Sequence, residues 1–400
     1  MREDIDSILA EKGADALLLY SDSIVGVNMY YLTKFLAPDP FILFKKVDAE
    51  PVIVIKQMEY PRAQKEALVK DVRSYADYDF KAKVSSTSDP ELGVLKFIAT
   101  VARKELGLGT RIFVPSNFPT MVADALRNDG LTLVPAFGVI EKARETKDRN
   151  EVNAIKTIQA ITEQVTKEVI EMISDTTVDS SGTLIAGFDG ERGPLTVGRI
   201  KSFLRHGFVD QKCSTENGII VACGTKGADP HYAGRAADEL KANQPIVLDI
   251  YPRSIHNRYW TDMTRTVVKG RASEEVKRMF ETVLEAKKVS IDALHAGVLG
   301  NDAYHTCCDV LEKAGYATPK QGIQPIKGFL HGLGHGVGLQ IHEGPTLNEL
   351  YRSALEDHNV VTVEPGLYDP DLGGVRIEDL VEVTKTGCTN LTRMEIELEI

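Results

Sequence analysis

Three of the nine histidines in the chain lie within one glycine-rich stretch, HGLGHGVGLQIHEGP, at residues 331–345. His331 and His335 are four residues apart, the spacing at which a helix would present both imidazoles to one metal ion. A helix is nevertheless disfavoured by about 1 kcal/mol for each interrupting glycine, and these are Gly332, Gly334, Gly336 and Gly338. We therefore expect an extended or looping segment whose backbone makes a close approach to a partner that the glycines by themselves do not identify.

Four acidic residues lie at or within apolar strand patterns in the same half of the chain. Asp249 closes the run PIVLDI, and Asp262 stands just before TRTVV. Glu364 ends VVTVE, and Glu378 lies in the alternating run GGVRIEDLVEV. A carboxylate in a buried strand is unfavourable unless a cation or hydrogen-bond donors compensate it. Each acid alone could be a turn cap or an ion-pair partner. The recurrence of four such acids in one half of the chain is what indicates a shared site.

Together with His335, the four carboxylates form a ligand set without thiolates. Such a set suits divalent Mn, Co, Fe or Zn. Four carboxylates balance the charge of two dications, whereas without metal they would repel and raise one another's pKa values. In the alternating run GGVRIEDLVEV, the two-residue period of a strand places Arg376 and Glu378 on one face and Val375 and Ile377 on the other. We predict a centre with two divalent metal ions.

Two groups of elements precede and surround these residues. Up to about residue 140, short apolar runs alternate with helical patterns, as in an α/β domain. Strands are expected at residues 16–20, 40–44, 51–55 and 111–114, and helices at residues 61–72 and 121–130.

A charged segment near residue 145 precedes a long amphipathic helix. Its apolar residues recur at three- and four-residue spacing from Val152 to Val169. A second helix is expected at residues 274–294, followed by glycine-rich strands over the last 75 residues. We place the domain boundary near residue 145, which gives domains 1–145 and 146–400.

Bulk composition excludes several classes of protein. The 400 residues, 43% apolar and 26% charged, are typical of a soluble globular protein. A net charge of −11 argues against sequence-independent binding of nucleic acid. No run approaches the roughly 20 apolar residues of a membrane span, and the first residues lack a signal-peptide core. The five cysteines lack CxxC spacing, so we expect a reduced, cytoplasmic protein with free thiols and no membrane contact.

The order of the five candidate ligands resembles that of the pita-bread metallopeptidases, which include aminopeptidase P, prolidase and methionine aminopeptidase. The matching phrases are TDMTRT, HGLGHGVG, HEGP, VEPGLY and GGVRIED. Residues 1–145 resemble the creatinase-type N-terminal domain of the proline-specific members. The resemblance implies an α/β N-terminal domain followed by an α+β pita-bread (creatinase/aminopeptidase) catalytic domain. It also implies a homodimer that hydrolyses the Xaa-Pro bond at the N-terminus of short peptides.

The resemblance also implies a role for each ligand. Asp249 would bind one metal ion, and Asp262 and Glu378 would bridge both. His335 and Glu364 would complete the second ion, and Glu364 would also be the general base.

The same resemblance assigns residues on the substrate side. His342 and His231 would assist catalysis, while Arg376 and His331 would bind substrate. For Arg376, a salt bridge that orients a ligand is an equally open interpretation. Tyr368 is a candidate for the pocket wall, although an aromatic residue near a strand end also suits the core.

One feature departs from the family pattern. The family usually has a DxG turn after the first aspartate and a shorter gap to the second. Here Asp249 is followed by Ile250, Tyr251 and Pro252, and Asp262 comes 13 positions later. The resemblance therefore leaves open the shape of the pocket wall that this segment builds.

The peptide bond before proline suits a two-metal centre. It has no N–H and its φ is restricted, whereas a two-metal centre acts on the carbonyl oxygen. An Xaa-Pro dipeptidase and an Xaa-Pro aminopeptidase both remain open. The alternatives on the same fold are a creatinase-like hydrolase that works without metal and a non-enzymatic binding protein, and the complete ligand set argues against both.

Overall fold

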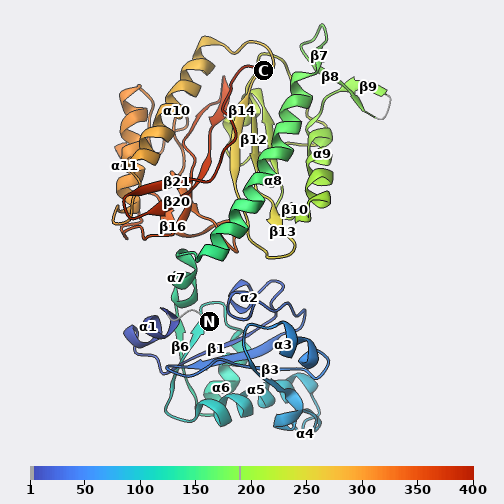
Figure 1. The fold of residues 1–400 in the computed structure, drawn as a ribbon, viewed down its shortest axis with the longest axis vertical. Helices are drawn as coiled ribbons and strands as arrows, with labels where there is room; N and C mark the ends of the chain where they lie inside the picture. Colours follow the sequence, from blue (N-terminus) through green and yellow to red (C-terminus); the bar gives the residue numbers. More distant parts are fainter. Residues whose placement is uncertain (1–3, 189–190) are drawn as a thin grey trace. The chain divides into compact units, whose positions relative to one another are not determined.

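The structure, a computed structural model, describes residues 4–188 and 191–400 (Figure 1). The chain divides into two compact units, Met1–Arg144 and Glu145–Ile400. Within the described residues, no helix combines the length and apolarity that crossing a membrane requires.

The first unit is built on a six-stranded sheet of order β4-β3-β2-β1-β5-β6. Its strands are β1 (Ala16–Ser21), β2 (Phe41–Lys46), β3 (Val52–Ile55), β4 (Asp71–Ser74), β5 (Arg111–Pro115) and β6 (Thr132–Ala136). β2 runs antiparallel to its neighbours, while the β1–β5, β5–β6 and β3–β4 pairs are parallel. The helices are α1 (Asp4–Glu11), α2 (Val27–Thr33), α3 (Tyr60–Glu66), α4 (Phe80–Ser85), α5 (Pro90–Leu106), α6 (Thr120–Asn128) and α7 (Val139–Glu145).

The four strands expected in this unit are confirmed, but the helix expected at residues 61–72 was too long. α3 ends at Glu66, because Ala67 adopts an extended conformation with φ −71° and ψ 144°. Asp71–Ser74 then form β4, which pairs in parallel with β3. This four-residue run, DVRS, is too short and too polar for its sequence to distinguish an edge strand from the end of a helix.

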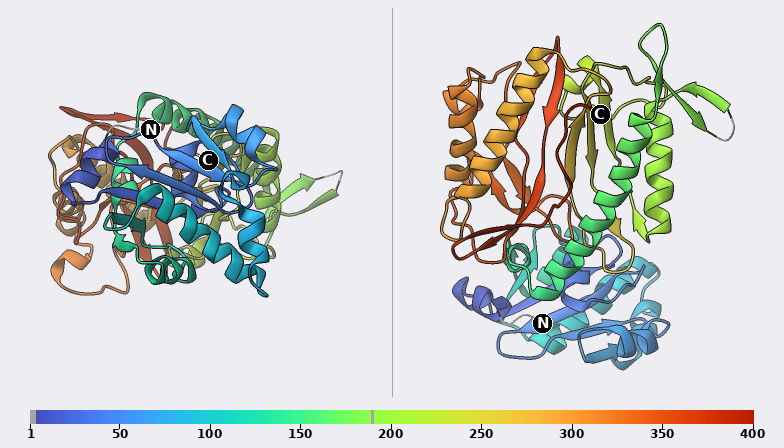
Figure 2. Two further views of the ribbon diagram at one scale, coloured as in Figure 1. Left: turned by 90° about the horizontal axis from the view of Figure 1, so that it is seen from below. Right: turned by 45° about the horizontal axis from the view of Figure 1, so that its top comes forward.

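Four helices frame the second unit: α8 (Arg149–Ser174), α9 (Val197–Asp210), α10 (Glu274–Ala293) and α11 (Gly300–Lys313). Figures 1 and 2 show α8 and α9 on one side of the strands and α10 and α11 on the other. α8 begins with a capping box, in which the Asp148 and Glu151 side chains each accept the other residue's backbone N–H. The long helices expected after residue 145 and at residues 274–294 are thus confirmed as α8 and α10.

Two sheets of this unit carry the residues of interest. The first has the order β11-β12-β14, from β11 (Ile220–Cys223), β12 (Ile246–Ile250) and β14 (Met263–Val267). The second has the order β16-β15-β17-β20-β21, from β15 (Gly334–Gly336), β16 (Glu343–Leu347), β17 (Val360–Val363), β20 (Asp379–Thr384) and β21 (Gly387–Asn390). The hairpin of β18 (Gly366–Asp369) and β19 (Gly373–Arg376) connects β17 to β20.

Candidate metal centre

One cavity of about 550 Å³ in the second unit is lined by all five candidate ligands. Asp249 lies on β12, and Asp262 directly precedes β14. His335 lies on β15, and Glu364 directly follows β17. The cavity therefore collects ligands from both sheets.

The glycines around His335 allow β15 to lie against its neighbours. A Cβ atom on Gly334 would lie 2.0 Å from the carbonyl oxygen of Thr362, and one on Gly336 would lie 2.2 Å from that of Gly344. The pairing of β15 with β16 shifts register between His335 and Gly336. The segment around His335 is extended, as its glycine content predicts. Glycine is required at positions 334 and 336 because a side chain at either one would collide with the adjacent backbone.

Glu378 does not lie within a continuous strand, contrary to the sequence-based expectation. β19 ends at Arg376 and β20 begins at Asp379. Between them, the N–H of Glu378 donates to the carbonyl of Thr264 in the first sheet at 3.1 Å. The chain changes sheet partners here, which interrupts the strand. The alternation nevertheless persists, since Val375 and Ile377 are fully buried while Arg376 and Glu378 line the cavity.

Asp262, His335 and Glu378 form the tightest part of the cluster. One ligand atom from each lies within 4.8 Å of the others. Within the described part of the chain, Asp262 Oδ1 and Glu378 Oε1 are buried and have no hydrogen-bond partner. Burial and nearby carboxylates raise the pKa of Asp262 and of Glu378 well above their usual range. Uncompensated oxygens that face an imidazole in this way fit a divalent cation.

His335 and Glu364 face each other across the same cluster. His335 Nε2 lies 3.3 Å from Glu364 Oε1 and 3.7 Å from Asp262 Oδ2. Burial opposes ionisation of Glu364, but the hydrogen bond and positive charge of His335, together with His331 and Arg376, outweigh it and lower the pKa of Glu364 to about 2. The Thr362 hydroxyl donates to Glu364 Oε1 at 3.2 Å. Glu364 is therefore ionised at neutral pH.

Arg376 makes an ion pair with Asp249, with Nη2 2.6 Å from Oδ2. Only 4% of the arginine is exposed. Its Nε donates to Thr264 Oγ1 at 3.2 Å, and that hydroxyl donates to Glu378 Oε2 at 2.7 Å. Of the two open interpretations of Arg376, these contacts favour orientation of ligands.

Tyr368 lies behind the cavity wall and is only 1% exposed. Its hydroxyl accepts a hydrogen bond from Arg376 Nη1 at 2.8 Å and lies 2.7 Å from His331 Nε2. His331 Nδ1 lies 2.7 Å from the Gly332 carbonyl, and burial lowers the pKa of His331. A neutral His331 therefore donates through Nδ1 and accepts from Tyr368. Of the two open interpretations of Tyr368, this burial favours a place in the core, where its hydroxyl positions His331.

His331, His342 and His231 all line the cavity. The ring of His342 packs edge-on against that of His335, with centroids 4.4 Å apart. Burial and the adjacent His335 lower the pKa of His342. His231 lies on an exposed loop, where its backbone N–H donates to Asp229 Oδ1 at 2.9 Å. His342 and His231 are thus placed to face a molecule bound in the cavity.

The sequence assigned no role to three further residues at the site. Thr264 and Thr362 hydrogen-bond the carboxylates of Glu378 and Glu364. Tyr251 lines the cavity, and burial together with Asp249 and Asp262 raises the pKa of its phenol to about 12. The sequence does carry a signal for Thr264, because period two from Asp262 places it on the same side of β14.

Comparisons with known proteins agree with this architecture. Residues 153–385 match metallopeptidase family M24, and residues 1–146 match the creatinase/prolidase N-terminal domain. The Xaa-Pro dipeptidase of Pyrococcus furiosus is 31% identical over 261 residues, 63% of this chain and 70% of that protein. The Xaa-Pro dipeptidase of Pyrococcus horikoshii is 36% identical over 180 residues, 45% of this chain and 48% of that protein.

A solved structure shows the same fold. The structure of an Xaa-Pro dipeptidase from Bacillus anthracis superposes with a TM-score of 0.79 at 24% sequence identity. The superposition covers 100% of this chain and 98% of that one.

Proposed function

The chain belongs to metallopeptidase family M24, and from this premise we propose that it hydrolyses the Xaa-Pro bond at the N-terminus of short peptides with two divalent metal ions. The expected pita-bread fold, the creatinase-type N-terminal domain and the metallopeptidase class are confirmed by the family matches and the solved relatives. The observation that carries the proposal is the cavity in which five candidate ligands meet, with two buried carboxylate oxygens uncompensated among the described residues.

Each ligand has a proposed place. Asp249 would hold one ion, Asp262 and Glu378 would be shared, and His335 and Glu364 would hold the other. Divalent ions there supply Lewis acidity toward a carbonyl oxygen and activate water near neutral pH. Arg376 would keep the Asp249 carboxylate in place through their ion pair.

The protein's own groups would move the proton. Glu364 is ionised, as a general base must be, and would take a proton from the attacking water. It would then return the proton to the proline nitrogen, which becomes an amine when the bond breaks. His342 or His231 would donate a hydrogen bond to the scissile carbonyl oxygen or hold the substrate, and His331 would contact the substrate.

The proposed substrates are peptides with proline at the second position. Curated relatives of this chain are named Xaa-Pro dipeptidases. Whether residues after proline are accepted distinguishes a dipeptidase from an aminopeptidase. We further propose that the enzyme is a cytoplasmic homodimer, which fractionation and light scattering would test. The five free cysteines agree with a reducing compartment.

The decisive experiment supplies metal to metal-stripped protein. Adding Mn²⁺, Co²⁺, Zn²⁺ or Fe²⁺ should restore cleavage of Ala-Pro, and comparison with Ala-Pro-Ala should show whether longer peptides are accepted. Glu364→Gln should lower kcat by about 10²–10⁴-fold, whereas Glu349→Gln, at a residue paired with His305 outside the cavity, should leave it unchanged. Failure to cleave any Xaa-Pro peptide with every metal would contradict the proposal. Creatine turnover in the presence of a chelator would instead support a creatinase-like hydrolase.

A further inference from the structure

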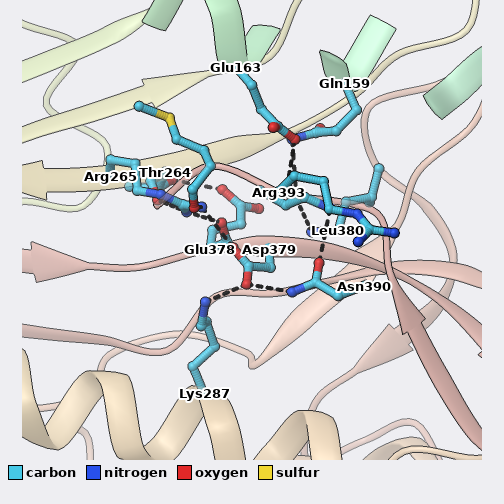
Figure 3. Close-up of polar contacts among 12 residues, drawn as sticks. Gln159, Glu163, Thr264, Arg265, Lys287, Glu378, Asp379, Leu380, Asn390 and Arg393 are labelled. Carbon is cyan, nitrogen blue, oxygen red and sulfur yellow. Dashed lines mark hydrogen bonds and ion pairs between the residues drawn. The ribbon is translucent and has the colours of Figure 1, made fainter. Parts of the chain in front are cut away.

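Three charged side chains form a buried triad directly behind Glu378: Arg265 on β14, Lys287 on α10 and Asp379 on β20 (Figure 3). They are 2%, 4% and 3% exposed. None of the three lines the cavity that holds the candidate ligands. The proposed mechanism therefore leaves this triad without a role.

Asp379 collects donors from three separate elements. Arg265 Nη2 lies 3.0 Å from Oδ1. Lys287 Nζ donates to Oδ2 from α10, and Asn390 Nδ2 donates to the same oxygen at 2.8 Å from β21. The carboxylate is thus enclosed by two cations and an amide.

Arg265 connects this carboxylate to the backbone of a candidate ligand. Its Nη1 donates to the carbonyl of Glu378 at 2.7 Å and to that of Thr264 at 2.9 Å. Its Nη2 also donates to the carbonyl of Met394 at 3.0 Å. The Glu378 N–H donates to the Thr264 carbonyl. Both polar groups of the Glu378 backbone are therefore held by β14.

The triad lies where the two ligand-bearing sheets meet. Asp379 pairs in register with Val363, the residue before Glu364. Thr264, the neighbour of Arg265, pairs in register with Asp249. A displacement at this junction would therefore change the spacing between the ligands of the first sheet and those of the second.

Stability alone does not account for such a triad. Removing ions from water is so unfavourable that apolar residues of similar volume often stabilise a protein as well or better. Hydrogen bonds behind a metal ligand, by contrast, commonly set its orientation and the affinity of the site.

We propose that Arg265, Lys287 and Asp379 are positioning residues that hold Glu378 and fix the separation of the two halves of the metal centre. This inference rests on the proposed metal site. Loss of the triad should weaken metal binding by about 10–100-fold, the effect typical of groups that orient ligands. This loss of metal affinity should be larger than the loss that destabilising the fold alone would cause.

The test is calorimetric titration of metal-stripped protein with Mn²⁺ alone. Asp379→Asn and Lys287→Met should each lower the affinity at least about tenfold. Excess Mn²⁺ should partly restore kcat/KM. Arg265→Lys, which keeps the charge but loses the fork that spans Glu378 and Asp379, should behave like Asp379→Asn.

Two further variants separate positioning from folding. The triple variant Arg265→Met, Lys287→Met, Asp379→Leu replaces all three charges together and is expected to stay folded while binding Mn²⁺ weakly. Val283→Ala removes buried volume from α10 one turn before Lys287 and should lower the melting temperature without changing Mn²⁺ affinity.

The outcomes distinguish this inference from the proposed function. Wild-type protein that binds no divalent metal would overturn the proposed metal centre itself. Wild-type protein that binds Mn²⁺, with folded triad variants that bind it equally tightly, would overturn the positioning role alone. A drop in affinity for Val283→Ala as large as that for Asp379→Asn would also overturn it.

Discussion

Tyr251 forms part of the cavity wall two residues after Asp249, at the position where the family usually has a glycine. Its phenol lies near the carboxylates of Asp249 and Asp262, and its hydroxyl donates only a long, 3.5 Å bond to the Asn217 carbonyl. The main effect of Tyr251 should therefore come from the volume of its ring beside the proposed metal ligands, and not from its hydroxyl. We expect it to limit the size of the residue that precedes proline.

Replacing Tyr251 should therefore change selectivity. Tyr251→Ala is expected to raise kcat/KM for Phe-Pro relative to Ala-Pro by about tenfold or more, because filling or vacating apolar pocket space is worth about 1–3 kcal/mol. Tyr251→Phe is the matched control and should leave the ratio unchanged. An unchanged ratio in Tyr251→Ala would place the substrate away from this wall.

The position of β15 explains why glycines surround His335. The strand lies so close to β17 that the backbone of Gly334 leaves no room for a side chain beside Thr362. His335 reaches the cluster because its strand can make this approach. The four-residue spacing of His331 and His335, which would suit a helix, therefore has no structural role here.

Gly334→Ala tests this packing. A methyl group 2.0 Å from the Thr362 carbonyl must push the strands apart, so we expect a loss of about 1–3 kcal/mol in the free energy of unfolding and weaker metal binding. Gly387→Ala on β21 is the control, since a Cβ atom there meets nothing within 4 Å. Urea denaturation and Mn²⁺ titration measure both effects. Equal behaviour of the two variants would show that β15 tolerates displacement.

The loop that carries His231 is closed by Asp238. Burial raises the pKa of Asp238, but hydrogen bonds from Lys226, Tyr232 and the Arg235 N–H outweigh it and lower the pKa to about 2. Because this lies below the value of about 3.9 for an unfolded chain, ionised Asp238 stabilises the fold above pH 4. That stability is lost as the pH falls through about 2.

Asp238→Asn should therefore destabilise the protein in a pH-dependent way. We expect a loss of about 1 kcal/mol at pH 7, as is typical of partly exposed charge pairs. The difference between wild type and variant should shrink between pH 4 and pH 2. Urea denaturation across this range provides the measurement, and a constant difference would mean that the charge of Asp238 is not what closes the loop.

Metal binding and the folding of the protein should be linked. All five candidate ligands lie in the unit Glu145–Ile400, on or directly beside strands of different sheets, so an unfolded chain cannot present them together. A ligand that binds only the folded state stabilises it.

Mn²⁺ at about 100 times its dissociation constant should add about 2.7 kcal/mol to the free energy of unfolding. The melting temperature should rise by roughly 5–10 °C, and EDTA should reverse the rise. Hydrogen exchange should slow within Glu145–Ile400. A melting temperature unaffected by EDTA in metal-loaded protein would contradict a preformed site.

Local patterns in the sequence determined much of this molecule. The ligand types, the extended glycine segment, the two long helices and the family resemblance all follow from short motifs or from helix and strand periodicity, which neighbouring residues set. The same patterns failed at β4 and at the break before Asp379, where the choice of sheet partner overrides local propensity.

The tertiary structure brings together residues that are distant in the sequence. It paired Arg376 with Asp249 and placed Tyr368 behind His331. It also joined Arg265 and Lys287 to Asp379, across 114 and 92 positions of the chain. No periodicity records such pairings, because they arise where two sheets and a helix pack together, and the burial that makes these charges influential exists only in the folded protein.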